Sequence, residues 1–391
     1  MKVGVYFGGA LSDPQSGGGY TFQYSLLQAI KRSNSPHEFV ILDSLQKNLS
    51  TPTDSLIKKA LLKCLRYRDA RQVQKNYKTF LNRAVLENGI DMVWFVTPAY
   101  QLVEVPYLYT VWDLQHRHQP FFPEVSVTGS TFEEREQHYA RVIPRAAYVL
   151  AGNETAKQEV MRFYGMSAQR VETLELPTPD FVLNQTFESI DVVEKYGIKK
   201  PYIFYPAQFW PHKNHVTLLH ALKLLKEQGC LVDLVLTGSD KGNLAYVQEM
   251  VELLGLAEQV HFLGFVSISE LVALYRAACA LTFASFFGPN NIPPLEAFAL
   301  GCPVIAADVD GMREQLGDAA LFFNPRSAEQ LAMNVHALLE SNELRGQLIA
   351  KGLQRARSWT CDDYVKKIVK ILDEFALVRR CWSSKQRYIH G

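Results

Sequence analysis

The sequence lacks three features that would each point at once to a protein class: paired cysteines, a long apolar run and an excess of one charge. Its six cysteines are scattered with no Cys-x-x-Cys pair, which is typical of reduced thiols in a cytosolic protein and not of a disulfide framework or metal site. No stretch approaches the roughly 18 consecutive apolar residues that a membrane-spanning helix needs. The formal charge of +1 excludes the global basic footprint of a nucleic-acid-binding protein.

The first residues favour a buried strand over a leader peptide. Met1–Phe7 form an apolar run that turns at Gly8, too short for a secretory signal and without a cleavage region. A hydrophobic content of 48% with 21% charged residues is ordinary for a soluble globular chain. Together with the unpaired cysteines, these features predict a cytoplasmic protein.

Length and hydrophobic pattern predict two α/β domains. At 391 residues the chain exceeds one ordinary core. Short apolar runs alternate with longer amphipathic stretches, which is the pattern of βαβ units around a parallel sheet. The expected strands are Lys2–Phe7, Phe39–Leu42, Met92–Val96, Tyr107–Val111, Tyr148–Ala151, Tyr202–Tyr205, Leu231–Thr237, Val260–Leu263, Ala280–Phe283, Pro303–Ala306 and Ala320–Phe323.

The domain boundary is expected within Thr178–Lys200. Prolines precede this polar stretch, and Gly197 and a further proline close it just before a new strand. We predict a first domain at residues 1–184 and a second at 195–365. A final helix follows the completed second sheet, and the sequence leaves open whether the segment 366–391 packs back on the first domain.

The strongest chemical signal lies in Ser285–Ile305. A strand ends near Phe283, a loop rich in glycine, proline and asparagine follows, and two prolines occupy the start of a helix, where they are well tolerated. Such a helix N-terminus favours anions. Glu296, near the end of the first turn, could accept both hydroxyls of a ribose while a pyrophosphate rests on the amides around Asn291 and Ile292. A capping glutamate on an ordinary helix is the alternative.

This segment resembles the nucleotide-sugar motif of the family 4 retaining glycosyltransferases, whose GT-B fold has two Rossmann-like domains with parallel sheets facing a central cleft. In that family a glutamate, seven residues and a second glutamate lead into a small-residue helix and then Gly-x-Pro-Val-Ile. Glu296 matches the second glutamate, which holds the ribose. Gly288 replaces the first, which touches the donor sugar, so an amide of Asn290 or Asn291 is the expected substitute. The residues expected at the nucleotide sugar here are Asn290, Asn291, Ile292, Leu295 and Glu296.

A second segment, Tyr202–His215, is similar to the family's strand and loop whose arginine and lysine neutralise the diphosphate. Lys213 matches the lysine, whereas Gln208 stands at the arginine's place and carries no charge. A charge-assisted hydrogen bond is roughly twice as strong as a neutral one, so another cation is needed, and His212 is the nearest candidate. A metal pair of His212 and His215 is disfavoured because no carboxylate or cysteine lies nearby at ligand spacing.

Three shorter matches extend the resemblance. Gly238 ends a strand where the family's second domain approaches the nucleotide, and backbone groups of Phe265 and Val266 are expected at the base edge. In the first domain a triple glycine precedes a helix, and it implies that Gly18 and Gly19 face the donor phosphates and sugar. A flexible loop without a ligand is the alternative there.

The last candidate segment is Tyr109–Pro120, a buried strand that ends in polar and titratable groups, as expected at a working edge of an α/β sheet. The family usually has His-Asp at this place. Asp113 matches the aspartate, Trp112 occupies the histidine position, and His116 lies three residues on. Asp113 and His116 are expected to hydrogen-bond the donor sugar or the acceptor, unless Asp113 only caps a turn and His116 lies at the surface.

Two charged segments have ordinary alternatives. Asp308 and Asp310 match an Asp-x-Asp metal motif, but no third oxygen ligand is apparent and a turn bordering the cleft is favoured. Residues 57–83 carry nine Lys/Arg and one acid among regularly spaced apolar residues. This pattern fits either a solvated charged face or, with the basic tail 379–387, a helix lying on the inner face of a membrane.

The resemblance implies a hexosyltransferase that acts with retention and needs no metal or other cofactor, with catalytic residues Asp113, His116, Lys213 and Glu296. UDP is expected over GDP or ADP, and glucose over other hexoses. The expected partners are the nucleotide sugar and a saccharide or lipid-linked acceptor in polysaccharide synthesis, with no nucleic acid. The resemblance also implies that residues 1–184 form the acceptor domain and residues 195–365 the nucleotide-sugar domain.

Two alternatives remain. One is a nucleotide-sugar epimerase of the same fold, which needs no acceptor. The other is a non-catalytic sugar-nucleotide binding protein, because Gln208, Gly288 and Trp112 depart together from the family pattern.

Overall fold

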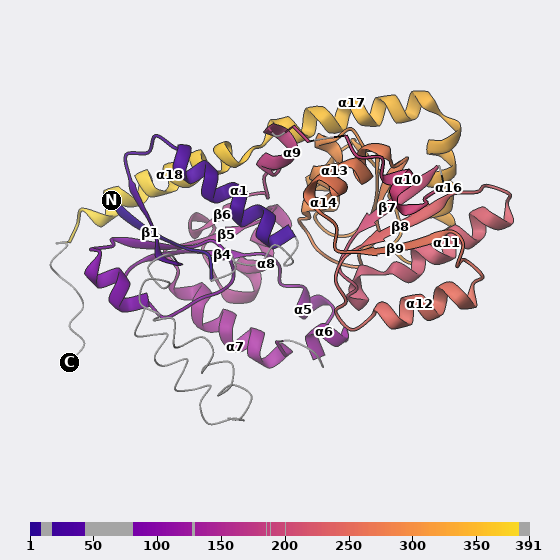
Figure 1. The fold of residues 1–391 in the computed structure, drawn as a ribbon. Coiled ribbons are helices and arrows are strands. Elements are labelled where there is room, and N and C mark those ends of the chain that lie inside the picture. Colours follow the sequence, from indigo (N-terminus) through magenta and orange to yellow (C-terminus); the bar gives the residue numbers. More distant parts are fainter. Residues whose placement is uncertain are drawn as a thin grey trace, which may run out of the picture.

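Two six-stranded parallel sheets form the two halves of the molecule in this computed structural model (Figure 1). The structure describes residues 1–8, 18–43, 81–126, 130–184, 186–187, 189–199 and 201–382. The expected fold class, two Rossmann-like domains with parallel sheets, is confirmed. Residues 57–80 of the basic segment 57–83, the end of the basic tail and Gly17 lie outside the described residues.

The first sheet has the strand order β2-β1-β3-β4-β5-β6, and every neighbouring pair is parallel. Its central strands are apolar and buried throughout, because helices cover both faces. The sequence analysis missed the edge strand β6, which has only three residues. The strands are β1 (Lys2–Tyr6), β2 (Glu38–Ile41), β3 (Met92–Phe95), β4 (Tyr107–Val111), β5 (Tyr148–Ala151) and β6 (Val171–Thr173).

The second sheet has the order β12-β11-β10-β7-β8-β9 and is also parallel throughout. The strand order reverses between β7 and β10, which is where open α/β sheets bind ligands at their carboxyl ends. The strands are β7 (Tyr202–Pro206), β8 (Asp233–Thr237), β9 (Val260–Gly264), β10 (Ala280–Phe283), β11 (Val304–Ala307) and β12 (Ala320–Phe323).

The helices connect and cover these strands, and several begin where a side-chain cap is present. Thr131 and Glu134 form a reciprocal capping box on α7, as Ser267 and Glu270 do on α13. The α-helices are α1 (Gly18–Arg32), α5 (Gln115–His118), α6 (Pro123–Ser126), α7 (Phe132–Val142), α8 (Glu154–Tyr164), α9 (Asp180–Asn184), α10 (Val192–Tyr196), α11 (His215–Glu227), α12 (Leu244–Leu253), α13 (Ile268–Ala277), α14 (Ile292–Ala299), α15 (Met312–Leu316), α16 (Ala328–Glu340), α17 (Asn342–Ser358) and α18 (Cys361–Arg379).

The last helix, α18, lies against the first domain beside α1, as Figure 1 shows in yellow and indigo. Its buried residue Tyr364 stacks on Trp94 of β3, with ring centroids 6.3 Å apart, and meets Phe22 of α1 edge-on at 5.7 Å. Ile368 and Leu372 are buried in the same apolar cluster. One face of the first sheet is therefore completed by the C-terminal end of the described chain.

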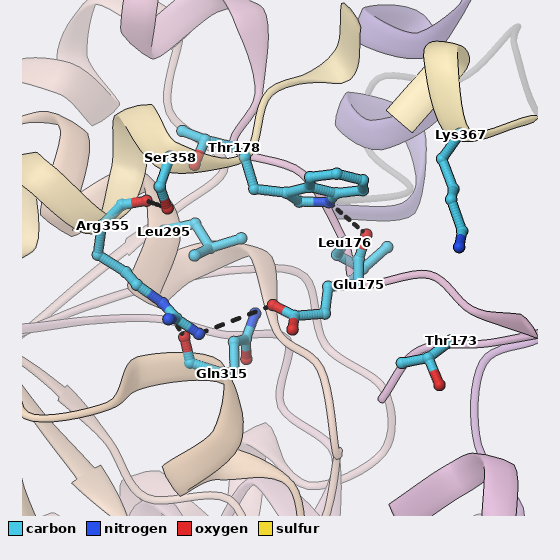
Figure 2. A pocket seen from close by; sticks show the side chains of 10 residues that line it. Thr173, Glu175, Leu176, Thr178, Leu295, Gln315, Arg355, Ser358 and Lys367 are labelled. Carbon is cyan, nitrogen blue, oxygen red and sulfur yellow. Dashed lines mark hydrogen bonds and ion pairs between the residues drawn. The ribbon is translucent and has the colours of Figure 1, made fainter. Parts of the chain in front are cut away.

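Two chain segments pass between the domains and are joined to each other. The backbone N–H of Thr178 donates to the carbonyl of Trp359, and the indole Nε1 of Trp359 donates to the carbonyl of Glu175 at 2.9 Å. Arg355, on α17, holds the end of α15 by donating to the carbonyls of Glu314 and Gln315. A cavity of about 380 Å³ lies beside this junction, and Figure 2 shows Arg355 directed toward Glu175 there. Among the described residues, no helix is both long and apolar enough to cross a membrane.

Candidate active site

A cleft of about 1070 Å³ lies between the domains, where the carboxyl ends of both sheets meet. The first domain contributes the start of α1 and the ends of β4 and β5, and the second contributes the loops after β7, β8, β9 and β10. Most of the predicted nucleotide-sugar residues line this cleft. They are Gly19, Asp113, Gln208, Lys213, Gly238, Phe265, Val266, Asn290, Asn291, Ile292 and Glu296.

Lys213 lies at the centre of the cleft, on a short turn after β7. Hydrogen bonds from two neighbouring side chains hold this turn in place. Tyr205 donates its hydroxyl to the carbonyl of Lys213 at 2.9 Å, and Asn214, with a left-handed φ of 58°, donates its amide to the carbonyls of Ala284 and Pro325. Burial lowers the pKa of Lys213 to about 8, although the charges of Asp113 and Glu124 oppose the shift. The ammonium is thus held in a crowded site facing the cleft.

Gln208, at the place of the family's arginine, lines the cleft and accepts a hydrogen bond from Nε1 of Trp210 at 3.1 Å. His212 does not replace the missing charge. Burial and the nearby charge of Lys213 lower its pKa to about 4, so its imidazole is neutral at pH 7. In the free protein His212 therefore does not add a second positive charge beside Lys213. Its Nδ1 contacts Glu124 of the first domain, and its ring stacks on Phe287 with centroids 4.1 Å apart.

Helix α14 begins at the cleft with two prolines in its first turn, as the sequence predicts. Glu296 lies one turn in, where burial raises its pKa to about 7 while a hydrogen bond from Tyr275, at 2.8 Å, partly opposes the shift. Pro293 and Pro294 supply no N–H, so the helix contributes chiefly the positive end of its dipole. A carboxylate beside it is suited to ribose hydroxyls and a diphosphate. Leu295 does not face this cleft; it lines the cavity beside the domain junction instead.

The structure separates the two asparagines that the sequence left as alternatives. Asn291 is tied into the protein, since its amide donates to the carbonyl of Gly288 at 2.6 Å and its backbone N–H donates to Gln315 at 2.9 Å. The side-chain nitrogen and oxygen of Asn290 are both buried and have no hydrogen-bond partner among the described residues. Both amide atoms of Asn290 are therefore unpaired, whereas the amide nitrogen of Asn291 is engaged.

On the first-domain side, Asp113 and Trp112 follow β4 and line the cleft. The Trp112 ring lies beside Gly19, 3.5 Å from the point where a Cβ would stand. The carboxylate of Asp113 accepts the backbone N–H of Gln115 at 3.1 Å, a turn-capping contact that leaves its other oxygen unassigned. Gly18, also predicted at the donor, begins α1.

His116 is not brought into the cleft. It is 1% exposed, and its Nε2 meets Glu136 of α7 at 2.6 Å. Burial lowers its pKa. The sequence analysis expected His116 to contact the substrate, and its position does not match that expectation. Asp113 follows β4 directly and lines the cleft, whereas His116 lies on α5 and is buried.

At the other end of the cleft, Gly238 and the loop after β7 approach each other closely. A Cβ on Gly238 would lie 2.4 Å from the carbonyl oxygen of Ala207, so only glycine fits there. Phe265 is 59% exposed and lines the cleft beside Val266. A flat apolar group next to backbone polar groups suits a nucleobase.

Contacts across the domain boundary escaped the sequence analysis. Nδ2 of Asn153 donates to the carbonyl of Pro289 at 3.0 Å, and the side chain of Asn290 lies against Gly152, where a Cβ would be 2.1 Å from its amide nitrogen. Gly311 lies equally close to Asn153, because a Cβ on Gly311 would be 2.2 Å from the amide nitrogen of Asn153. The only sequence signal for these contacts was glycine at the ends of predicted strands.

The described residues contain no group of three or more potential metal ligands. Asp308, the first residue of the Asp-x-Asp match, pairs instead with Arg313 at 2.7 Å.

Comparisons with known proteins agree with this geometry. Residues 188–355 match the family model described as "Glycosyl transferases group 1". The O-antigen chain mannosyltransferase B of Escherichia coli is 27% identical over 221 residues, which are 56% of this chain and 58% of that protein. The chain spans about half the length of the curated relatives that it matches.

Solved structures share the fold over nearly the whole chain. Sucrose-phosphate synthase from Thermosynechococcus elongatus has a TM-score of 0.72 at 16% identity, covering 97% of this chain and 100% of that one. HepE of Anabaena, in complex with UDP-glucose, has a TM-score of 0.69 at 15% identity, covering 96% and 100%. The expected resemblance to family 4 glycosyltransferases and the GT-B arrangement are both confirmed.

Proposed function

We propose that this chain, whose second domain belongs to the group 1 glycosyltransferases and whose two domains have the GT-B fold, moves a hexose from a nucleotide sugar to a saccharide acceptor. The transfer retains the anomeric configuration and serves polysaccharide synthesis, with a free or lipid-linked saccharide as acceptor. The observation that carries the proposal is that Lys213 and Glu296, from separate loops of the second domain, line one cleft with the N-terminus of α14.

Each residue has a role that its position supports. The ammonium of Lys213 and the positive end of the α14 dipole stabilise the charge that develops on the departing diphosphate. Glu296 accepts the ribose hydroxyls, and Asn290 offers its free amide to the donor sugar in place of a carboxylate at position 288. Asp113 orients the sugar or the acceptor from the first domain. The departing phosphate assists in removing the acceptor's proton, and closure of the domains excludes water.

The donor we favour first is UDP-glucose, which the solved HepE structure contains. A second candidate sugar is mannose, because the O-antigen chain protein of Escherichia coli is named as a mannosyltransferase. Glucose and mannose differ only in the configuration at C2, so the amide of Asn290 and the carboxylate of Asp113 are the groups placed to tell them apart.

The first test is thermal stabilisation by UDP, GDP and ADP in buffer with EDTA. A ligand at about 100 times its dissociation constant adds roughly 2.7 kcal/mol of stability. We expect one nucleotide to stabilise the wild type, and both Lys213→Ala and Glu296→Gln to lose that shift. Lys223→Ala, at a half-exposed lysine on α11 outside the cleft, is the matched control and should keep it. No shift with any nucleotide would refute the proposal.

Turnover then separates the alternatives. Incubating UDP-glucose and GDP-mannose with the protein and no acceptor tests for an epimerase, which would convert the sugar. Adding saccharide acceptors tests for transfer. Nucleotide binding without turnover of either donor would leave the non-catalytic binding protein as the remaining interpretation.

A further inference from the structure

Glu124, on the short helix α6 of the first domain, reaches across the domain boundary to the turn that carries Lys213. Its Oε1 accepts the backbone N–H of His212 at 3.2 Å and also contacts Nδ1 of the same residue. Burial keeps His212 neutral near pH 7, and an ionised carboxylate has no donor, so Nδ1 carries the proton of this contact. One oxygen of the first domain therefore holds both the backbone and the ring of the residue that precedes Lys213.

Further contacts close the domain boundary at the same point. Gln119 donates its amide to the carbonyl of Phe286 at 3.0 Å, and the ring of Phe122 lies edge-on to that of Phe287, with centroids 5.4 Å apart. The backbone N–H of Phe286 donates in turn to the carbonyl of His212 at 2.9 Å. His212 is thus anchored at its N–H by the first domain and at its carbonyl by its own domain, so the turn is fully fixed only while the two domains are in contact.

Hydrogen bonding alone does not explain a carboxylate at position 124. Glu124 is 6% exposed, and its Oε2 is buried with no hydrogen-bond partner among the described residues. An amide oxygen would accept the same contacts from His212 without the cost of burying a charge. Burial acts to raise the pKa of Glu124, but the hydrogen bonds from His212 outweigh it and leave the pKa below its ordinary value. The carboxyl is therefore ionised at neutral pH, and a buried negative charge needs a cation nearby.

Lys213 supplies that cation. Burial has the largest effect on its ammonium and lowers its pKa to about 8, while the charges of Asp113, at the end of β4, and of Glu124 oppose the shift. The imidazoles of His212 and His215, which lie close to it, have pKa values lowered by burial to about 4 and about 3, so neither is charged at neutral pH. Without the charge of Glu124, Lys213 would lose its proton at a lower pH.

We propose that Glu124 is a positioning residue for the diphosphate site, which acts through His212 to fix the turn of Lys213 and through its charge to keep the ammonium protonated. The inference rests on the proposed function, because it takes Lys213 to bind the diphosphate of the donor. Since Glu124 belongs to the first domain and Lys213 to the second, the diphosphate site is complete only when the two domains touch. Domain contact and donor binding are thereby coupled through one pair of residues.

Two substitutions separate the two effects of Glu124. Glu124→Gln keeps an oxygen that accepts from His212 and removes the charge, whereas Glu124→Ala removes both. The measurement is calorimetric titration of the full chain between pH 6 and 9 with UDP, or with GDP or ADP if one of these stabilises the wild type instead. In Glu124→Gln the loss of affinity at high pH should begin about half a pH unit or more below that of the wild type. In Glu124→Ala affinity should also fall at least about fivefold at pH 6.5, where Lys213 is charged, because the turn is no longer held.

Lys213→Arg provides the background that isolates the charge, because a guanidinium stays protonated without help from a carboxylate. Glu124→Gln should not shift the pH dependence of binding in that background. Glu133→Gln, at an exposed carboxylate of α7, is the matched control and should behave as the wild type. The melting temperature of each unliganded variant checks its fold, and Glu124→Gln decides the question if Glu124→Ala does not fold.

The outcomes separate this inference from the proposed function. A falling limb that is absent from the wild type, unshifted in Glu124→Gln or shifted equally in the Lys213→Arg background overturns the role of Glu124 while nucleotide binding stands. Tighter binding by Glu124→Gln at every pH also overturns it, because the carboxylate would then only repel the diphosphate. Failure of every nucleotide to bind the wild type refutes the proposed function instead.

Discussion

The hydroxyl of Tyr275 donates a hydrogen bond to Oε2 of Glu296 at 2.8 Å, deep beneath the first turn of α14. Both side chains are buried, and burial raises the pKa of Glu296 from its ordinary 4.5 to about 7. The hydrogen bond stabilises the ionised form and limits the rise. The carboxylate is consequently poised between its two protonation states near neutral pH.

Replacing Tyr275 with phenylalanine should shift the pH dependence of nucleotide binding. Only ionised Glu296 can accept both ribose hydroxyls, so wild-type affinity should rise with pH through about 7. Tyr275→Phe removes a hydrogen bond to the ionised form, worth about 1 kcal/mol, which moves the midpoint up by somewhat less than one pH unit. Calorimetric titration of the stabilising nucleotide from pH 6 to 9 measures it. Glu296→Gln should abolish this rising limb, and an unshifted midpoint in Tyr275→Phe would contradict the prediction.

The same carboxyl should affect stability without any ligand. Folded protein keeps the Glu296 proton up to about pH 7, whereas the unfolded chain loses it near 4.5. Between these values the folded state binds more protons, so the free energy of unfolding should fall as pH rises. Glu296→Gln removes this contribution. Urea unfolding of both proteins at pH 5 and pH 7.5 should show a smaller loss of stability in the variant, and an equal loss would count against a buried, protonated Glu296.

Lys213→Arg should extend nucleotide binding to higher pH. Burial lowers the pKa of Lys213 to about 8, so the free protein loses this positive charge above that pH. Wild-type affinity should drop about tenfold for each pH unit beyond it, whereas arginine stays charged. The ratio of dissociation constants at pH 9 and pH 7 is the measurement. If both proteins lose affinity equally, the falling limb does not come from Lys213.

Gly311→Ala should disturb the loop that carries Asn290. A Cβ there would lie 2.7 Å from the carbonyl of Pro289 and 2.2 Å from the amide of Asn153, at a φ of 84°. Gly242→Ala is the matched control, because its φ is 98° and nothing lies within 4 Å of its Cβ. Both variants should lose roughly 1 kcal/mol or more to backbone strain. Sugar transfer, measured with radiolabelled donor, should fall only in Gly311→Ala.

Restoring the family's glutamate at Gly288 should not improve the protein. At a φ of 123° a side chain is strained by roughly 1–3 kcal/mol, and its Cβ would press on Asn291, which anchors this turn. Gly288→Glu and Gly288→Ala should therefore melt at similarly reduced temperatures, with donor turnover below that of wild type. A gain of turnover in Gly288→Glu but not in Gly288→Ala would contradict this prediction, because it would show that a carboxylate at position 288 aids the reaction.

Most of the fold could be predicted from the sequence, because strands buried on both faces appear as short apolar runs. Tyr107–Val111 and Ala280–Phe283 were predicted with their observed bounds. Val171–Thr173 was missed because it is short, lies at the sheet edge and is only partly buried, so it shows no clear pattern.

The site was predicted less completely than the fold, because some of its contacts join residues that are far apart in the sequence. Lys213, Glu296 and Asp113 follow strands, and local pattern was enough to place them at a sheet edge. The partner of His212 is Glu124, 88 residues away in the other domain, and its surroundings make it neutral. Nothing local in the sequence encodes burial produced by a distant domain, and for the same reason Asn290 and Asn291 could not be told apart.

Because α18 packs on the first domain, the order of translation decides which domain core is completed first. Residues 192–356 supply the buried core of the second domain from one continuous stretch. The core of the first domain is incomplete without Tyr364, Ile368 and Leu372, which leave the ribosome after all of that stretch. Until α18 has been made, Trp94 and Phe22 lack the side chains that α18 packs against them. The half that is translated first is therefore finished last, and a nascent chain halted before residue 361 leaves this part of the apolar cluster open to chaperones and proteases.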